Sequence, residues 1–459
     1  MIERFAPYIE SRVKNKRIDP EKTKNFLSSS IVKRYLKKYQ LLKLKKTINL
    51  SYENSPFYHR LFEKNNIRPG EIKSFEDLKK IPLTSSEDLR KPGDFFTTSK
   101  ENFVKIFSSS GTTGPPKRIF FTKDDLDDQI HGIRTGLKIL YGIRDNDNIR
   151  VTYDHGYGSD DWGVRYCMEN AIEKTGALSI FTGARLPAEE ELELLKTYKI
   201  SIIMGTPSYL NSLTHDLKKL CDLKKLNVRE ILVGTEPLTK SIRKSLEKSW
   251  NASVYQGYGL TEMGTSVAGE CSEKNGMHVS ESDFIVEIID PDSEEILEPG
   301  NVGELVFTTL ARRGMPILRY RTHDLGMIMP DECPCGLPFK RIVIKGRTDK
   351  MITIGSGDNI YPTVFDNVLF DIPSVIDYQV ILERKQNKDY LKILVESDDK
   401  SENIKKQVKK AVMSISEIRD GIKESKTIHI PEIKIVKRHT IDRSSVKAKK
   451  IVDNRKLYE

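Results

Sequence analysis

The sequence lacks the long apolar stretches that define membrane proteins. None of its apolar runs approaches the ~20 residues that a membrane-spanning helix needs. The first ten residues, MIERFAPYIE, include acidic side chains and no apolar core, so they do not resemble a secretory signal. We therefore expect a cytoplasmic protein with no membrane partner.

Cysteine is also scarce. The 459 residues include five cysteines, an odd number that argues against a disulfide framework in a chain of this size. Cys271 is followed by His278, and Cys333 and Cys335 come about fifty positions later. Three thiols and an imidazole match the ligands of a closed tetrahedral zinc site. The spacing alone leaves a second interpretation open, in which these are unrelated buried thiols and a surface histidine.

No single element gathers the positive charge. The formal charge is +10, from 76 Lys and Arg against 66 Asp and Glu, and the basic residues are scattered apart from modest clusters at 33–46 and 405–410. A nucleic-acid-binding protein more often concentrates such residues on one element, with aromatic residues between them. We therefore expect a solvated lysine-rich surface and no nucleic-acid partner. The basic field would favour the approach of an anionic substrate.

The middle of the chain alternates between two kinds of element. Between about residues 100 and 260, short β-rich runs alternate with amphipathic helices, which predicts a mostly parallel sheet covered by helices. From about 279 to 345 the helices give way to consecutive strands of a β subdomain. The predicted fold class is α/β. A large N-terminal domain of helix-covered mixed and parallel sheets spans 1–345, a junction spans 346–352, and a small mobile α+β domain spans 353–459.

One loop has an unusual composition: SSSGTTGPPK, residues 108–117. Glycines let backbone N–H groups approach an anion closely, and hydroxyl groups add further donors. A strand–loop–strand of this composition therefore suits a polyphosphate. The spacing differs from the Walker pattern, and no helix follows the loop directly. For the loop alone, a flexible polar turn is an equally good interpretation.

The loop and the segments that follow it resemble the adenylate-forming superfamily, which includes acyl-CoA synthetases, luciferases and peptide-synthetase adenylation domains. The loop resembles the phosphate-binding signature of that superfamily. YGLTE (258–262) resembles its adenine and magnesium segment, and YRTHDLG (320–326) its ribose-binding segment. GRTDKMI (346–352) resembles the hinge, and RSSVKAKKIVDNR (443–455) the segment that carries the catalytic lysine.

Further stretches, among them NSPFYHRLF (54–62) and ARRGMPILRYRTHD (311–324), resemble the phenylacetate–CoA ligase branch. That resemblance implies two steps. A carboxylate, expected to be an aryl acid, attacks the α-phosphorus of ATP to give an acyl adenylate, and the thiol of coenzyme A then displaces AMP. The implied cofactors and co-substrates are ATP, Mg²⁺ and coenzyme A. Some members of the branch carry a structural zinc site, and dimers are common in it, so a homodimer is compatible with the resemblance.

The resemblance assigns most site residues to the nucleotide. Tyr258 would offer its ring to the adenine, Thr261 would donate to the α-phosphate, and Glu262 would bind magnesium. Lys117 would add positive charge near the phosphates. The β- and γ-phosphates would contact the loop at Ser109, Ser110, Gly111, Thr112, Thr113 and Gly114. The other residues expected around the nucleotide are Gly234, Thr235, Glu236, Gly259, Asp324 and Arg347.

Two positions depart from the family pattern. Asp324 is expected to accept hydrogen bonds from both ribose hydroxyls, but His323 precedes it where the family has glycine. The catalytic lysine is expected at Lys447, where the usual preceding glycine is also missing. Lys449 and Lys450 are close alternatives for that role. A charged lysine at this point would stabilise the transition state of adenylate formation.

The remaining expected site residues belong to the hinge and to the acyl pocket. Asp349 takes the hinge position, about which the C-terminal domain would rotate between the two steps. The segment HGYGSDDWG (155–163) takes the place of the acyl pocket. Its two acids either hold a polar substrate or cap the next helix from solvent, so the identity of the acid stays open. The expected pocket residues are His155, Tyr157, Gly158, Asp160, Asp161 and Trp162.

Two other functions remain open. The first is an adenylating enzyme that transfers the acyl or adenylyl group to a carrier protein, an amine or a cofactor. The sequence contains no recognisable carrier, condensation or thioesterase segment, which favours free coenzyme A. The second is a non-catalytic nucleotide- or RNA-binding protein. The intact loop, Glu262, Asp324 and a C-terminal lysine argue against it.

Overall fold

The computed structural model divides into two compact units, which we describe separately. Unit 1 comprises Met1–Gly183 and Tyr255–Ile344, and unit 2 comprises Ala184–Val254 and Lys345–Glu459. One unit boundary therefore lies beside the predicted junction at 346–352, and the predicted domain limits stay a prediction. The structure describes residues 30–109, 117–153, 163–182, 186–348, 351–355, 358–386, 388–438, 440–441 and 450–455.

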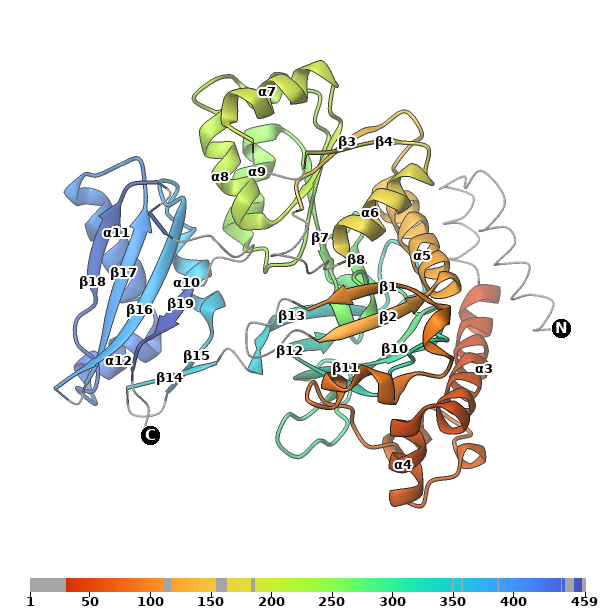
Figure 1. The fold of residues 1–459 in the computed structure, drawn as a ribbon. Coiled ribbons are helices and arrows are strands. Elements are labelled where there is room, and N and C mark those ends of the chain that lie inside the picture. The colour runs from red at the N-terminus through yellow and green to blue at the C-terminus, as the bar shows by residue number, and fades with distance from the viewer. Residues whose placement is uncertain are drawn as a thin grey trace. The chain divides into compact units, whose positions relative to one another are not determined.

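The first described elements of unit 1 are two helices and a hairpin. Helices α3 (Ser30–Asn54) and α4 (Pro56–Lys64) are followed by short 3-10 helices, which lead to the hairpin of β1 (Phe103–Ser108) and β2 (Arg118–Thr122) (Figure 1). The two strands are antiparallel, with Ser108 opposite Arg118. The predicted strand–loop–strand around the glycine-rich segment is therefore confirmed.

Helix α5 (Lys123–Tyr141) follows β2 directly. Its N-cap is Thr122, whose side chain accepts from the Asp125 N–H while the Asp125 carboxylate accepts from the Thr122 N–H. This capping box satisfies two donors that a helix N-terminus would otherwise leave unpaired. Gly142 ends the helix with φ of +60°, a conformation that favours glycine.

The remaining strands of unit 1 form two groups. The first is a parallel pair of β3 (Asn148–Val151) and β4 (Leu178–Phe181). Helix α6 (Val164–Glu173) connects these two strands along the chain and packs against α5 (Figure 1). A second set runs in the order β10-β11-β12-β13-β9-β8-β7. Its bounds are β7 (Ser253–Tyr258), β8 (Ala268–Glu270), β9 (Met277–Val279), β10 (Phe284–Ile289), β11 (Val302–Thr309), β12 (Tyr320–Ile328) and β13 (Arg341–Arg347).

Unit 2 combines a parallel pair with a separate small sheet. Strands β5 (Ile202–Gly205) and β6 (Glu230–Val233) are parallel, and every residue of β5 is buried, as expected for a parallel strand covered on both faces. The four-stranded sheet has the order β18-β17-β16-β19, in which β16 and β17 are antiparallel. Along β17, buried residues alternate with partly exposed ones, which is the period of a strand with one buried face.

The remaining elements of unit 2 surround these strands. Strands β14 and β15 form a short antiparallel hairpin. The helices and strands of the C-terminal part confirm its predicted α+β character. The bounds are α7 (Ala188–Thr197), α8 (Pro207–Leu217), α9 (Lys240–Trp250), β14 (Ile352–Ile354), β15 (Asp358–Ile360), α10 (Pro362–Leu369), β16 (Asp377–Lys385), β17 (Lys388–Glu396), α11 (Glu402–Val412), α12 (Ser416–Lys423), β18 (Glu432–Val436) and β19 (Ile451–Asp453).

The architecture agrees with the predicted α/β fold class. Parallel strands connected by helices, an antiparallel β-rich segment and a C-terminal α+β segment follow one another along the chain as predicted. Within the described residues, none of the helices combines the length and the apolarity needed to cross a membrane.

Candidate functional site

The two described ends of the glycine-rich loop are hydrogen-bonded to each other. The Ser109 N–H donates to the Lys117 carbonyl oxygen at 2.9 Å, and the Lys117 N–H donates to Ser109 Oγ at 3.0 Å. These bonds continue the β1–β2 ladder by one step and fix Lys117 at the base of the loop. The other predicted loop residues lie outside the described part of the chain: Ser110, Gly111, Thr112, Thr113 and Gly114.

A buried carboxylate lies beside Lys117. Glu262 belongs to a short 3-10 helix, η7 (Thr261–Met263), and is 6% exposed. Its Oε1 lies 2.6 Å from Lys117 Nζ and accepts from the Tyr320 hydroxyl at 3.0 Å. Lys117 Nζ also donates to that hydroxyl at 3.3 Å. The residue just before β2 is thus brought together with residues of η7 and β12, and two of the three were predicted site residues.

The electrostatics of this group keep Glu262 ionised. Burial opposes ionisation of Glu262, but the charge and hydrogen bond of Lys117, with the Tyr320 hydroxyl, outweigh it, so the pKa of Glu262 is held below its usual range. An ionised carboxylate is the hard oxygen ligand that Mg²⁺ prefers. The sequence did not identify Tyr320 as part of this group. The signal available was its position as the first residue of YRTHDLG.

A second residue that the sequence did not reveal supports the backbone at Glu262. Arg312 is 7% exposed, and its Nη1 donates to the Glu262 carbonyl oxygen at 2.7 Å. Its guanidinium lies 4.7 Å from the centroid of the Phe121 ring, which is a cation–π contact. Burial lowers the pKa of Arg312 to about 10. The neighbouring turn also requires glycine, because a Cβ on Gly259 would lie 1.5 Å from a backbone oxygen of Thr265.

The predicted adenine and ribose residues also meet. The Tyr258 hydroxyl, at the end of β7, donates to Asp324 Oδ2 in β12 at 2.6 Å. The Tyr258 ring lies 6.2 Å from that of Phe307, which is fully buried. Asp324 is itself 7% exposed. The aromatic ring and the carboxylate expected around a nucleoside are therefore neighbours within unit 1.

The structure accounts for the histidine that replaces glycine before Asp324. His323 has φ of +61°, in the left-handed region that favours glycine. Its N–H donates to Glu304 Oε1 at 2.9 Å, and its Nδ1 lies 3.7 Å from the same oxygen. The departure from the family pattern thus keeps a backbone conformation for which glycine is the usual choice.

Four of the residues expected around the nucleotide belong to unit 2. Thr235 has φ of +68°, which is strained for a β-branched residue, and its buried Oγ1 has no hydrogen-bond partner within the described parts of the chain. Glu236 accepts from the Ser208 N–H at 3.2 Å, at the N-terminus of α8. Gly234 donates its N–H to the Gly205 carbonyl oxygen at 3.2 Å, and Arg347 ends β13.

Of the three lysines considered for catalysis, Lys450 is described. Its ammonium group is paired with Asp377 and lies 4.7 Å from the ring centroid of Tyr378 and 4.9 Å from that of Phe370. Burial opposes its charge, but the carboxylates around it leave the pKa of Lys450 raised. The predicted residues outside the described part of the chain are Lys447, Lys449, Asp349, His155, Tyr157, Gly158, Asp160, Asp161 and Trp162.

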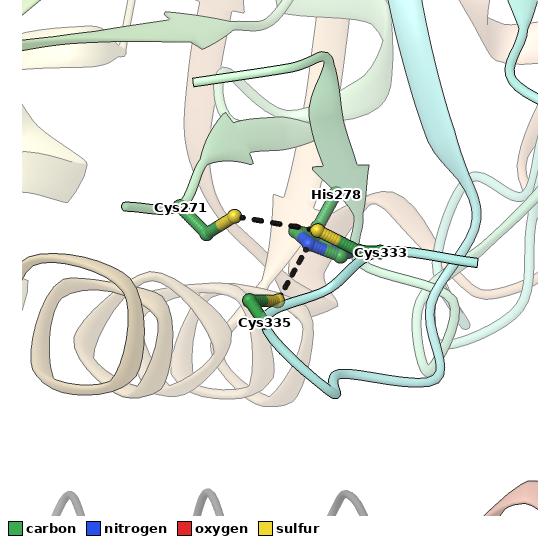
Figure 2. A group of neighbouring side chains, drawn as sticks. All are labelled: Cys271, His278, Cys333 and Cys335. Atoms are coloured by element: carbon green, nitrogen blue, oxygen red, sulfur yellow. Dashed lines mark hydrogen bonds between the residues drawn. The ribbon is translucent and has the colours of Figure 1, made fainter. Parts of the chain in front are cut away.

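The four predicted metal ligands are brought together in unit 1 (Figure 2). Their ligand atoms all lie within 4.8 Å of one another, with Cys271 Sγ 3.6 Å from Cys333 Sγ and Cys335 Sγ 3.3 Å from His278 Nε2. With zinc–sulfur bonds of ~2.3 Å, neighbouring ligands of a tetrahedral site lie roughly 3.7 Å apart. The observed distances fit that geometry.

The surroundings of this cluster also suit a cation. His278 Nδ1 lies 3.0 Å from the Phe339 carbonyl oxygen, an arrangement that orients the ring with Nε2 toward the thiols. Burial raises the pKa of the Cys271 thiol to about 12 and also raises that of Cys335. The alternative of unrelated thiols and a surface histidine does not describe this arrangement.

Two family models match the chain. The model of AMP-binding enzymes matches residues 43–310, and that of the AMP-binding enzyme C-terminal domain matches residues 357–455. The phenylacetate–coenzyme A ligase of Aromatoleum evansii is 32% identical over 92% of this chain and 94% of its own length. The phenylacetate–coenzyme A ligase of Thermus thermophilus is 34% identical over 79% of this chain and 81% of its own.

Solved structures agree in fold. A crystal structure of 2-hydroxyisobutyryl-CoA ligase in the postadenylation state, in complex with 2-HIB-AMP, matches with a TM-score of 0.78 at 22% identity, over 91% of this chain and 89% of that one. A benzoate CoA ligase from Burkholderia xenovorans matches with a TM-score of 0.55 at 16% identity, over 76% and 68%. Together, the family models and the relatives show that the chain belongs to the AMP-binding enzyme family, in the phenylacetate–CoA ligase branch of the adenylate-forming acid–thiol ligases.

Proposed function

We propose that the chain is an ATP-dependent acid–CoA ligase that acts on an aryl acid. In the first step, a carboxylate oxygen attacks the α-phosphorus of ATP, the bond to the β-phosphate oxygen breaks, and acyl-AMP and pyrophosphate form. In the second step, the sulfur of coenzyme A attacks the acyl carbon, AMP leaves, and the thiol proton is released. The observation that carries the proposal is the buried, ionised Glu262 held by Lys117 and Tyr320 at the base of the glycine-rich loop.

The residues of unit 1 have complementary roles in the first step. Glu262 would hold Mg²⁺, which would offset the charge of the phosphates, and Lys117 would exchange part of its contact with Glu262 for contact with ATP. Thr261 would donate to the α-phosphate. Asp324 would accept from the ribose hydroxyls beside the ring of Tyr258, whose hydroxyl already bonds to that carboxylate. Each role depends on positioning and charge rather than on covalent chemistry.

The catalytic lysine is assigned to Lys447. The pairing of Lys450 with Asp377 holds that ammonium group within the C-terminal sheet, which disfavours Lys450 for a role at the phosphate. We expect Lys447→Ala to lower the rate of acyl-adenylate formation at least 100-fold, since one well-placed donor contributes about that much. Thioester formation from supplied acyl-AMP should change far less. A larger adenylation defect in Lys449→Ala would instead assign the role to Lys449.

The cysteine–histidine cluster is proposed to hold a structural zinc ion. Cys271, His278, Cys333 and Cys335 supply four ligands, so they leave no open position for chemistry. Purified protein should contain one zinc ion per chain, and its removal by a chelator should lower Tm by several degrees. Cys221, a cysteine outside the cluster, provides the matched control: Cys221→Ser should retain the metal, whereas Cys333→Ser should lose it. Metal content well below one ion per chain would refute the site.

The activity is tested with a panel of carboxylic acids. Pyrophosphate release that depends on the acid, followed by thioester formation when coenzyme A is added, is the expected result for an aryl acid. Adenylate that accumulates despite coenzyme A would indicate another acceptor, such as a carrier protein, an amine or a cofactor. An absence of pyrophosphate release across a panel of aryl and aliphatic acids would favour a non-catalytic nucleotide-binding protein.

A further inference from the structure

A buried carboxylate to which the proposed chemistry assigns no role lies on the strand next to that of Asp324, the residue predicted to bind the ribose. Glu304, in β11, is 0% exposed. Its two oxygens face β12 and bind different groups. Oε1 accepts from the His323 N–H at 2.9 Å, and Oε2 accepts from Arg321 Nη2 at 2.7 Å and Nε at 3.2 Å. A buried charge with this many donors is arranged for a specific geometry, because burial without them is costly.

The geometry that Glu304 fixes is a bulge in β12. On β11, Glu304 pairs with Leu325 and Val306 pairs with Arg321, so β12 has more residues than β11 across this step. The additional residues include His323, with its φ of +61°, and Asp324. A bulge of this kind changes the direction in which the following side chain points.

Two other bonds complete the bulge. The Thr322 hydroxyl donates to the Leu305 carbonyl oxygen at 2.7 Å, and the Asp324 N–H donates to Thr322 Oγ1 at 3.0 Å. Asp324 then places Oδ2 2.6 Å from the Tyr258 hydroxyl. The position of the Asp324 carboxylate is therefore connected to Glu304 through a short chain of hydrogen bonds and backbone.

Arg321 holds Glu304 from the other side. Besides Glu304, it bonds to Glu294 at 2.8 Å and to the Pro291 carbonyl oxygen at 2.9 Å, both in the connection between β10 and β11. The hydrogen bond with Glu304 raises the pKa of the Arg321 guanidinium. Glu294 is 53% exposed, whereas Glu304 is fully buried, so the same arginine has one partner that shapes the bulge and one at the surface.

We propose that Glu304 is a positioning residue for nucleotide recognition: it builds the β12 bulge that directs the Asp324 carboxylate toward the two ribose hydroxyls. The inference rests on the proposed function, because that proposal assigns the ribose to Asp324. Glu304 does not touch the nucleotide. It acts through the His323 N–H and the backbone of residues 321–324.

The test compares two nucleotides that differ only in the ribose hydroxyls. Binding of ATP and of 2′,3′-dideoxy-ATP is measured by calorimetry with Mg²⁺ and without any carboxylic acid, so that no turnover occurs. The wild type should prefer ATP roughly tenfold or more, because hydrogen bonds to a charged group are among the stronger ones. In Glu304→Gln the affinity for ATP should fall until the preference is within about threefold, while the affinity for 2′,3′-dideoxy-ATP stays unchanged.

Two further variants make the result specific. Glu294→Gln removes the exposed partner of Arg321 and should keep the wild-type preference. Arg321→Lys keeps the positive charge but lacks the two-pronged donor, so it should reduce the preference partially. If Glu304→Gln does not fold, Arg321→Lys decides the question by the same criterion.

The outcomes separate this inference from the proposed function. A folded Glu304→Gln that retains the preference, or that weakens both nucleotides equally, overturns the inference. A wild type that does not distinguish the two nucleotides overturns the assignment of Asp324 and the inference together. A preserved nucleotide preference with no acid-dependent pyrophosphate release overturns the proposed function alone.

Discussion

At the residue scale, the pairing of Glu262 with Lys117 links stability to pH. The pKa of Glu262 in the folded chain lies below its unfolded value near 4.5. The pair therefore contributes stability that is present above pH ~4.5 and is lost as the pH falls through the folded-state pKa. Without Lys117, burial would instead raise the pKa of Glu262, and stability would be lost as the pH rises.

Lys117→Met tests this reversal. Removal of one partner of a buried pair leaves an uncompensated carboxylate, so we expect a loss of about 3 kcal/mol in the free energy of unfolding at pH 8. The loss should be smaller at pH 5, where protonation of Glu262 relieves the buried charge. Denaturant unfolding at the two pH values measures the difference, and Lys117→Met/Glu262→Gln should recover most of the loss at pH 8. An equal loss at both pH values would contradict this electrostatic account.

Some site residues could be predicted from the sequence by their type and spacing. The residues that support them through long-range contacts could not. The set of Cys271, His278, Cys333 and Cys335 was predicted from ligand chemistry together with the family resemblance, and it meets in space. Tyr320 and Glu304 were missed because their roles depend on burial and on partners far away in the chain, which no local pattern encodes. The predicted contacts of residues 110–114 and 155–162, and those of Lys447, stay predictions.

At the scale of elements, the N-terminus of α5 joins two parts of unit 1. Asp125, 5% exposed, accepts from the Thr122 N–H within the capping box and also from the N–H groups of Arg313, at 2.7 Å, and Gly314, at 3.1 Å. One carboxylate therefore satisfies the helix cap and the loop before β12. The cap joins residues three positions apart in the sequence, whereas the contact with Arg313 and Gly314 is long-range.

Three variants separate these functions. Thr122→Ala should cost about 1 kcal/mol in the free energy of unfolding, which is typical for the loss of an N-cap, and Thr122→Ser should cost little. Asp125→Ala should cost more, because it also leaves the N–H groups of Arg313 and Gly314, the second of them buried, without their acceptor. Urea unfolding of the three variants measures the order. A Thr122→Ala variant that is less stable than Asp125→Ala would contradict the role of the long-range bonds.

Element prediction succeeded where the pattern was long enough. The apolar strands β5 and β6 and the amphipathic helices α5 and α8 lie in the region, about 100–260, where alternating β-rich runs and amphipathic helices were predicted. The three-residue strands β14, β15 and β19 were not, since three residues carry too little periodicity. These strands are defined by pairing with distant segments, such as that of β19 with β16.

At the scale of the whole molecule, unit 2 contains contacts that bear on the proposed two-step reaction. Arg438, just after β18, pairs with Asp216 of α8 and donates to the Ser212 carbonyl oxygen at 3.1 Å and to Ser212 Oγ at 3.0 Å. The Asn211 side chain of the same helix donates to the Ile376 carbonyl oxygen at 3.3 Å. These bonds hold the C-terminal α+β segment against α8. A rotation of that segment between the two steps would have to break them.

Arg438→Ala is therefore expected to affect the two steps unequally. Without the bonds to Asp216 and Ser212, the observed arrangement of the C-terminal segment is less stable relative to a rotated arrangement. The equilibrium between the two arrangements then shifts by the free energy of the lost contacts. If this arrangement serves adenylation, acyl-AMP formation should fall several-fold, with little loss of thioester formation from supplied acyl-AMP. Lys434→Ala, which removes an exposed ion pair on β18, is the matched control and should leave both steps unchanged. Equal losses in both steps would indicate damage to the fold instead.

Asp349→Pro should give the opposite pattern. The proposed hinge must change its backbone dihedrals during rotation, and proline fixes φ near −65°, which restricts one of the two arrangements. Acyl-AMP formation should be retained and thioester formation should fall, as measured by pyrophosphate release and by transfer from supplied acyl-AMP. In the double variant with Arg438→Ala, the thioester defect should persist, because weaker contacts at α8 cannot restore a rotation that the backbone no longer permits. Recovery of thioester formation in the double variant would place the barrier in the Arg438 contacts and remove Asp349 from the hinge.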